Sequence, residues 1–247
     1  MACSDLPVWY LRQRLAVIDF RSTAWRRAKA EVVTPGYAPA VCLARLEKAG
    51  RVRRIGRGLF IVVDVVREIP AIAIASGLFA DDPHYVTTDA ALVFYGLIDQ
   101  PVRRIVVVQS RRRSPTNIGS SVVWPVRLGA DRVLGAEAYD TTADGFRVRV
   151  ASRAQAIVDA LAEPTWMEHA DLLAEVLVTL SDEELKRAAA LARARSTAAA
   201  QRLGYLLEDA RRGIPESLAD LRPLRAVRLR PSLKRKGPYS TRWRVYG

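Results

Sequence analysis

Apolar positions recur at helical spacing along the first 50 residues and predict three helices there. The first follows Asp5, the second follows a cap at Ser22 or Thr23, and the third begins near Ala38. Asp, Ser and Thr are favoured before a helix because their side chains accept hydrogen bonds from its first N–H groups. The chain is therefore expected to begin with a three-helix unit.

The third helix has two different faces. Cys42, Leu43 and Leu46 share one face and are expected to point into a core. Gly50 is well placed to end the helix, because glycine readily adopts the left-handed backbone conformation found there. The opposite face is mostly small, with two cations, and consists of Ala40, Val41, Ala44, Arg45 and Lys48.

The segment Arg51–Val63 predicts a β-hairpin with a basic first strand. Val52 and Ile55 stand among arginines, Gly56–Gly58 forms the turn, and Leu59–Val63 is a β-prone run. A basic hairpin directly after three helices is typical of a winged helix-turn-helix. In that fold the third helix enters the major groove of DNA, while the hairpin lies over a phosphate strand or the minor groove.

After residue 66 the pattern changes to a mixture of strands and helices. Strands are expected at Arg104–Gln109, Ser121–Leu128, 133–139 and 146–150, and helices at Ile69–Phe79, Asp89–Tyr95 and over most of 153–211. We therefore predict an α/β (α+β) fold with two domains. Residues 1–66 form the winged helix, and residues 67–247 form a larger domain with a mixed sheet, a helical half and a basic C-terminal segment.

The excess of positive charge lies at both ends of the chain, while the middle is nearly balanced. The net charge is +13 over 247 residues. Residues 1–66 hold 12 Lys and Arg against 5 Asp and Glu, residues 67–210 hold 16 against 19, and residues 211–247 hold 11 against 2. Clustered cations attract nucleic acid because phosphate neutralisation releases condensed counterions. The alternative is a solvated surface in an arginine-rich proteome.

Candidate enzyme chemistry is sparse. The only histidines, His84 and His169, are interpreted as a loop residue and a helix-surface residue. Asp182–Glu184 lies in the first turn of a predicted helix, where negative charge is favoured by the helix dipole. No phosphate-cradling glycine motif or nucleophile elbow occurs. We expect no catalytic residue, metal or cofactor, with a metal-dependent nuclease or nucleotidyltransferase as the alternative.

The location expected from the sequence is the cytoplasm. No run approaches the roughly 18 apolar residues of a membrane span. The first residues, Met1–Asp5, lack the basic start and apolar stretch of a secretory signal.

Several short segments occur in an order that covers nearly the whole chain. They are Leu43–Phe60, Tyr85–Leu97, Ala154–Leu161, Arg202–Glu208 and Arg242–Val245. Together they resemble the AbiEi antitoxins of bacterial type IV toxin–antitoxin systems. The resemblance implies an autorepressor that binds inverted repeats in its own promoter through its N-terminal domain. It also implies a C-terminal domain tied to neutralising a nucleotidyltransferase-like toxin, without a need for direct contact.

The candidate DNA contacts fall into two groups. Arg53, Arg54 and Arg57 are expected at phosphates or the minor groove, while Arg45 and Lys48 face the major groove. The full set is Arg26, Arg27, Tyr37, Ala40, Ala44, Arg45, Lys48, Arg51, Arg53, Arg54 and Arg57. Candidates for a second DNA contact are Arg111, Arg112, Arg113, Lys234, Arg235 and Lys236. A solvated helix face is the alternative for Arg45 and Lys48, and a charged sheet edge for the hairpin arginines.

Two other function classes remain open. Residues 67–247 could form a protein-interaction module that neutralises a partner by direct binding, with interface aromatics among Trp166, Tyr205, Trp243 and Tyr246. Core packing is the alternative for Tyr205. RNA binding is disfavoured because no exposed stacking aromatics are expected near the basic hairpin.

Overall fold

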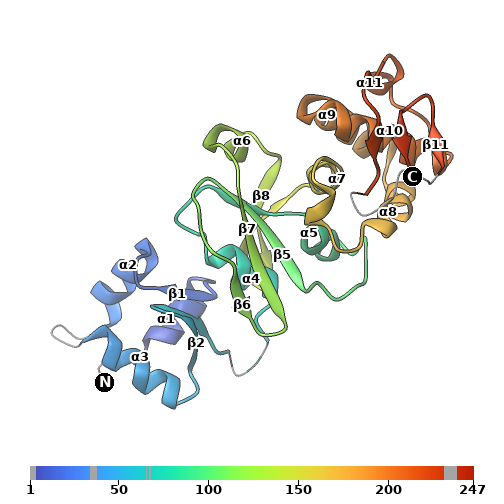
Figure 1. Ribbon diagram of the computed structural model, residues 1–247. Coiled ribbons are helices and arrows are strands. Elements are labelled where there is room, and N and C mark those ends of the chain that lie inside the picture. Colours follow the sequence, from blue (N-terminus) through green and yellow to red (C-terminus); the bar gives the residue numbers. More distant parts are fainter. Residues whose placement is uncertain (1–3, 34–37, 65, 67, 231–237) are drawn as a thin grey trace. The chain divides into compact units, whose positions relative to one another are not determined.

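The computed structural model describes residues 4–33, 38–64, 66, 68–230 and 238–247. The chain contains both helices and strands, which confirms the predicted mixed α/β class (Figure 1). The chain divides into two compact units. The first comprises Met1–Val86, Arg103–Gly135 and Tyr139–Val150, and the second comprises Thr87–Val102, Ala136–Ala138 and Ala151–Gly247. Residue 66 lies inside the first unit, so an independent domain of residues 1–66 stays a prediction.

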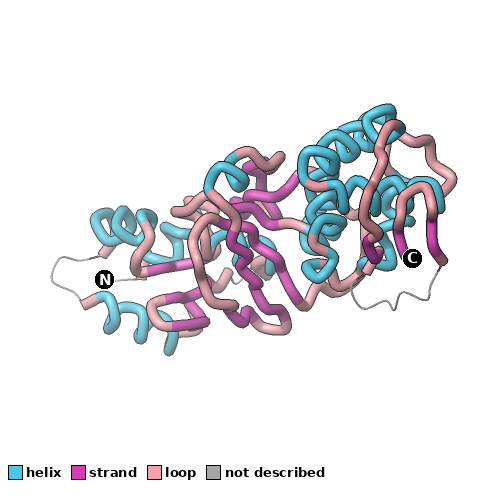
Figure 2. The backbone as a smooth tube through the Cα atoms, turned by 45° about the horizontal axis from the view of Figure 1, so that its top comes forward, coloured by secondary structure: helices cyan, strands magenta, loops and turns pink. Residues whose placement is uncertain are grey.

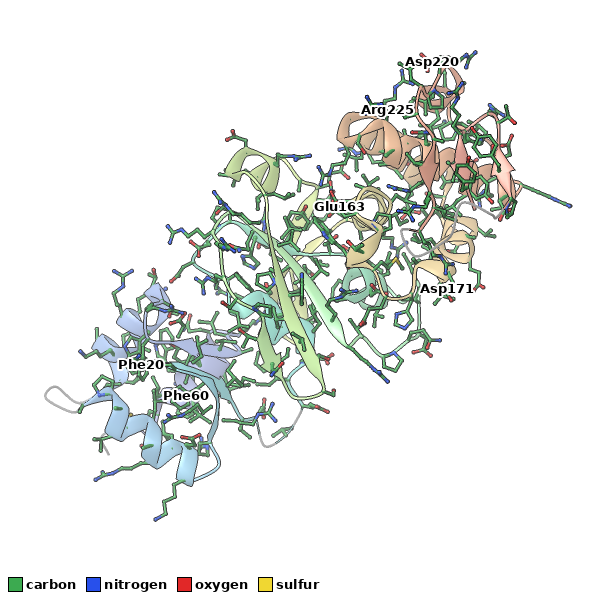
Figure 3. All side chains as sticks on the ribbon, in the orientation of Figure 1. Phe20, Phe60, Glu163, Asp171, Asp220 and Arg225 are labelled. Atoms are coloured by element: carbon green, nitrogen blue, oxygen red, sulfur yellow. The ribbon has the colours of Figure 1, made fainter. Side chains whose placement is uncertain are left out.

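The first unit begins with helices around a small sheet. Its elements are α1 (Leu6–Arg12), β1 (Val17–Asp19), α2 (Thr23–Val32), α3 (Pro39–Lys48), β2 (Val52–Gly56) and β3 (Leu59–Val62). Strand β3 is central and pairs antiparallel with both β1 and β2. Leu6, Ile18 and Leu43 are fully buried between the helices and this sheet. The labelled rings of Phe20 and Phe60 lie together in this core, with centroids 5.9 Å apart (Figure 3).

The rest of the first unit is built on a six-stranded mixed sheet. The strands are β4 (His84–Val86), β5 (Arg104–Gln109), β6 (Thr116–Ile118), β7 (Ser121–Arg127), β8 (Ala138–Ala143) and β9 (Phe146–Ala151). Their order is β6-β7-β5-β4-β9-β8. Helices α4 (Ala71–Gly77) and α6 (Ala130–Leu134) contact β4 and β5. Strand β5 is buried from Ile105 to Gln109, as its apolar run predicts.

Three details of this sheet differ from the prediction. Strands β4 and β6 were not expected, and the predicted strand at 133–139 is wrong because α6 ends at Leu134 and β8 begins only at Ala138. Each missed strand has three residues, which is too short to show the alternation of a strand. Their pairing is set by partners that lie elsewhere in the chain.

The second unit is mostly helical (Figure 2). Its elements are α5 (Thr88–Phe94), α7 (Arg153–Ala162), the short 3₁₀ turns at Pro164–Trp166 and Ala170–Leu172, α8 (Leu173–Thr179), α9 (Asp182–Arg195), α10 (Thr197–Asp209), α11 (Glu216–Ala219), β10 (Val227–Arg228), β11 (Tyr239–Ser240) and β12 (Val245–Tyr246). Helix α7 packs against α5, α9 and α10. The strands form a small sheet in the order β10-β12-β11. Within the described ranges, no helix combines the length and apolar character that crossing a membrane requires.

Candidate nucleic-acid interface

Helix α3 presents a small, partly basic face to solvent. Pro39 occupies its first turn, where the missing N–H of proline costs nothing. Cys42, Leu43 and Leu46 are buried, which confirms the predicted core face. On the opposite side, Ala40, Val41, Ala44, Arg45 and Lys48 are all exposed. Two alanines beside two cations leave room for a close approach of another molecule to this helix.

The end of α3 leads directly into the hairpin. Gly50 has a φ of +66°, and its N–H donates to the Glu47 carbonyl. The N–H of Arg51 donates to the Leu46 carbonyl, which closes the helix. The exposed face of α3 and the strand β2 are therefore joined by only three residues.

Strand β1 braces the turn of the hairpin. The Phe20 N–H donates to the Gly58 carbonyl at 3.1 Å. Gly58 has a φ of +72°, and a Cβ at this position would lie 3.4 Å from the Phe20 ring. The register of β2 and β3 shifts between Arg54 and Gly56, which adds a bulge just before the turn. These contacts fix the position of the turn from which the Arg57 side chain extends into solvent.

The four arginines of the hairpin are in different environments. Arg53, Arg54 and Arg57 are exposed, whereas Arg51 is half-buried. Arg54 lies 3.4 Å from the Glu47 carboxylate and 5.0 Å from the centroid of the Phe60 ring. For Arg57, no carboxylate of the described residues lies within ion-pair distance. The charge of Arg54 is thus partly neutralised, while that of Arg57 is available to a polyanion.

Helix α2 contributes two exposed arginines that the sequence singled out. Ser22 caps the helix by accepting from the Trp25 N–H. Arg26 donates to the Thr23 hydroxyl, and the guanidinium of Arg27 lies 6.0 Å from the centroid of the Trp9 ring. Arg27 therefore packs partly on α1.

The loop after β5 holds the three consecutive arginines in unequal roles. Arg113 donates to Asp82 at 3.0 Å and to the Leu78 carbonyl at 3.1 Å. Arg111 lies 3.1 Å from the other oxygen of Asp82. Arg112 is exposed, and none of the described carboxylates pairs with it. A second DNA contact at this loop stays a prediction, and Arg112 has the guanidinium most available for it.

Four of the candidate DNA contacts lie outside the described residues, and one of the suggested interface aromatics is buried in a core. Tyr37, Lys234, Arg235 and Lys236 lie outside the described residues. Trp243 is only 1% exposed and belongs to the core of the second unit, so its suggested role as an interface aromatic is wrong. The other suggested interface aromatics, Trp166, Tyr205 and Tyr246, are half-buried.

Both histidines lie in environments that the sequence did not reveal. His84 is a buried residue of β4 and not a loop residue. Its Nε2 accepts from the Ser76 hydroxyl, and its Nδ1–H donates to the Asp82 carbonyl, both at 2.9 Å. Because Nδ1 carries the ring proton, Nε2 must accept, so the Ser76 hydroxyl donates to His84 while it accepts from the Arg149 N–H. Burial lowers the pKa of His84 below its usual value of 6.5.

His169 precedes a 3₁₀ turn instead of lying on the surface of a helix. Its Nδ1 and its backbone N–H both contact Asp89, at 2.9 and 3.0 Å. Asp89 is fully buried and also accepts from the Glu168 N–H. This carboxylate therefore ties the segment before α8 to α5. In the part of the chain that the structure describes, no three His, Cys, Asp or Glu side chains gather so that they could hold a metal ion.

Comparison with solved structures finds a similar fold in the crystal structure of the RV2827C protein from Mycobacterium tuberculosis. The two share 18% sequence identity with a TM-score of 0.64, over 98% of this chain and 90% of the other. At this identity the likeness shows the fold alone. No protein-family model matches the chain, and no curated protein matches it.

Proposed function

We propose that this protein is a transcriptional repressor that binds inverted repeats in its own promoter through residues 1–66. The observation that carries the proposal is the exposed small and basic face of α3 beside an exposed arginine hairpin. Major-groove recognition needs a helix that can approach base edges closely, together with cations that hold the flanking phosphates. This surface offers both.

The element order supports interpreting this segment as a winged helix-turn-helix. In that interpretation α2 and α3 form the helix-turn-helix, β2 and β3 form the wing, and β1 completes the sheet. Arg45 and Lys48 then face the major groove, with Ala40 and Ala44 allowing close approach. Arg53 and Arg57 contact phosphates or the minor groove. Arg54 contacts a phosphate once its ion pair with Glu47 has broken.

We also propose that the protein acts as the antitoxin of a type IV system. This proposal rests on the resemblance of five ordered segments to the AbiEi antitoxins. Residues 67–247 then counteract a nucleotidyltransferase-like toxin in the cytoplasm. Expression of a toxin encoded beside this gene should arrest growth, and coexpression of the full chain should relieve the arrest. Continued arrest with normal antitoxin levels would contradict this role.

Binding to the DNA upstream of its own gene tests the repressor proposal. Fluorescence anisotropy measures the affinity of the full chain for a labelled duplex. The chain should bind the promoter duplex more tightly than a duplex of the same length in which the repeats are scrambled. Specific and non-specific affinities of DNA-binding proteins typically differ by about 10³-fold or more. Equal affinity for the two duplexes at every salt concentration would contradict sequence-specific repression.

A further inference from the structure

A hollow of about 680 Å³ lies within the first unit, between the start of α2 and the loop after β5. Its lining brings together arginines from two distant parts of the sequence. They are Arg21, Arg26, Arg111, Arg112 and Arg113. Three aspartates also line the hollow, which leaves it with an excess of two positive charges.

All three aspartates are already engaged. The side chain of Asp82 is only 3% exposed and lies between Arg111 and Arg113. Asp19 accepts from the backbone and the guanidinium of Arg21, at 2.9 and 3.2 Å. Asp81 accepts from the N–H of Thr23 at 2.8 Å, at the first residue of α2. Asp19 and Asp82 thus pair with arginines and hold the walls of the hollow together, whereas Asp81 is held by a backbone N–H and keeps its charge in the hollow. The excess of two positive charges remains after all three aspartates are counted.

The loop that carries Arg112 is fixed on both sides. On one side, the Arg111 N–H donates to the Gln109 side chain at 2.7 Å. On the other, Arg113 bonds Asp82 and the Leu78 carbonyl, and its guanidinium lies 5.2 Å from the centroid of the Phe79 ring. The backbone at Arg112 is therefore held in place before any ligand arrives, which reduces the entropy lost on binding.

We propose that this hollow is a phosphate-binding site whose ligands are the side chains of Arg26 and Arg112. Both are exposed and line the hollow, and no carboxylate among the described residues pairs with either. Among the described residues, the Arg26 side chain contacts only the Thr23 hydroxyl, and a phosphate oxygen can take the place of this acceptor. A guanidinium presents paired N–H groups that match phosphate oxygens, so each of these two side chains can hold a phosphate through two hydrogen bonds.

Two sources can supply the phosphate. One is the backbone of the DNA bound by α3 and the hairpin, and this version rests on the proposed function. It would extend the footprint beyond residues 1–66. The other is free phosphate or a phosphomonoester, which binds whether or not the protein is a repressor.

The DNA arm of the test measures how affinity for the promoter duplex depends on chloride concentration. The full-length variants are Arg26→Ala, Arg112→Ala and the matched control Arg132→Ala, an exposed arginine of α6 that does not line the hollow. Each lost phosphate contact lowers the salt slope by about 0.9. We expect this reduction for Arg26→Ala and Arg112→Ala, and an unchanged slope for Arg132→Ala.

The second arm titrates the same proteins with inorganic phosphate in an isothermal calorimeter. The site would be assigned to free phosphate if Arg26→Ala and Arg112→Ala both lose phosphate binding while the salt dependence of their DNA affinity stays unchanged. Arg132→Ala should keep its phosphate binding in that case. If Arg112→Ala and Arg132→Ala show the same salt slope for DNA and the same affinity for inorganic phosphate, the inference is overturned. If Arg26→Ala folds poorly, the results for Arg112→Ala alone decide whether the hollow binds phosphate. Failure of the proposed function looks different, because the wild type would then not prefer the promoter duplex, whatever the phosphate titration shows.

Discussion

The indole ring of Trp243 packs against the backbone of Gly204 in α10, leaving no space for a side chain at that position. A Cβ on residue 204 would overlap the six-membered ring. The indole N–H donates to the Glu208 carboxylate at 2.8 Å, one turn further along the helix. The Gln201 amide donates to the Trp243 carbonyl at 2.8 Å, one turn before it. This glycine therefore allows the C-terminal segment to lie directly on α10.

The first prediction concerns this close approach. Gly204→Ala should lower the free energy of unfolding by about 1 to 3 kcal/mol, because the methyl group must displace the ring or the helix. Chemical denaturation followed by Trp fluorescence measures the change. Gly213→Ala is the control, since no atom lies within 4 Å of a Cβ there and its φ is not positive. Equal stability of the two variants would mean that Trp243 does not pack on α10 as described.

The second prediction separates neighbouring arginines by their roles. Arg113→Ala removes one partner of the buried Asp82 carboxylate and should cost roughly 1 to 3 kcal/mol of stability. The cost is below that of a fully buried pair because the Arg113 side chain is 28% exposed. Arg112→Ala should change stability by less than about 0.5 kcal/mol. Thermal unfolding compares the two, and similar losses would contradict the framework role assigned to Arg113.

The third prediction concerns pH. Because the pKa of His84 is lowered in the folded chain, the unfolded chain binds more protons below pH 6.5. Stability should therefore fall as pH drops from 6.5 toward the folded pKa, by up to about 1.4 kcal/mol per pH unit. His84→Gln removes this contribution, so its free energy of unfolding should depend less on pH over that window. Denaturation at a series of pH values measures both slopes, and identical slopes would show that His84 titrates normally.

Local features of the chain could be predicted because their causes are local. The burial of Cys42, Leu43 and Leu46 follows from helical spacing. The capping box at Ser181 and Glu184 follows from four consecutive residues. In both cases the residues that decide the structure are sequence neighbours.

The remaining features depend on partners far away in the sequence. Asp82 and Arg113 are 31 residues apart, and neither has a local pattern that predicts their pairing. His84 was assigned to a loop because β4 has only three residues and is stabilised by pairing with β5 and β9. The hollow beside α2 could not be predicted either, although both of its proposed ligands, Arg26 and Arg112, were candidates for DNA contact.

The central claim is that the hairpin arginines hold DNA phosphates while α3 lies in the major groove. Its most direct test is the salt dependence of binding to the promoter duplex for the wild type, Arg57→Ala and the double variant Arg53→Ala/Arg57→Ala. Arg132→Ala is the charge-matched control for the single variant. We predict that the slope falls by about 0.9 in the single variant and about 1.8 in the double variant, and stays at the wild-type value in the control. Slopes equal to the wild type in both hairpin variants would contradict the account.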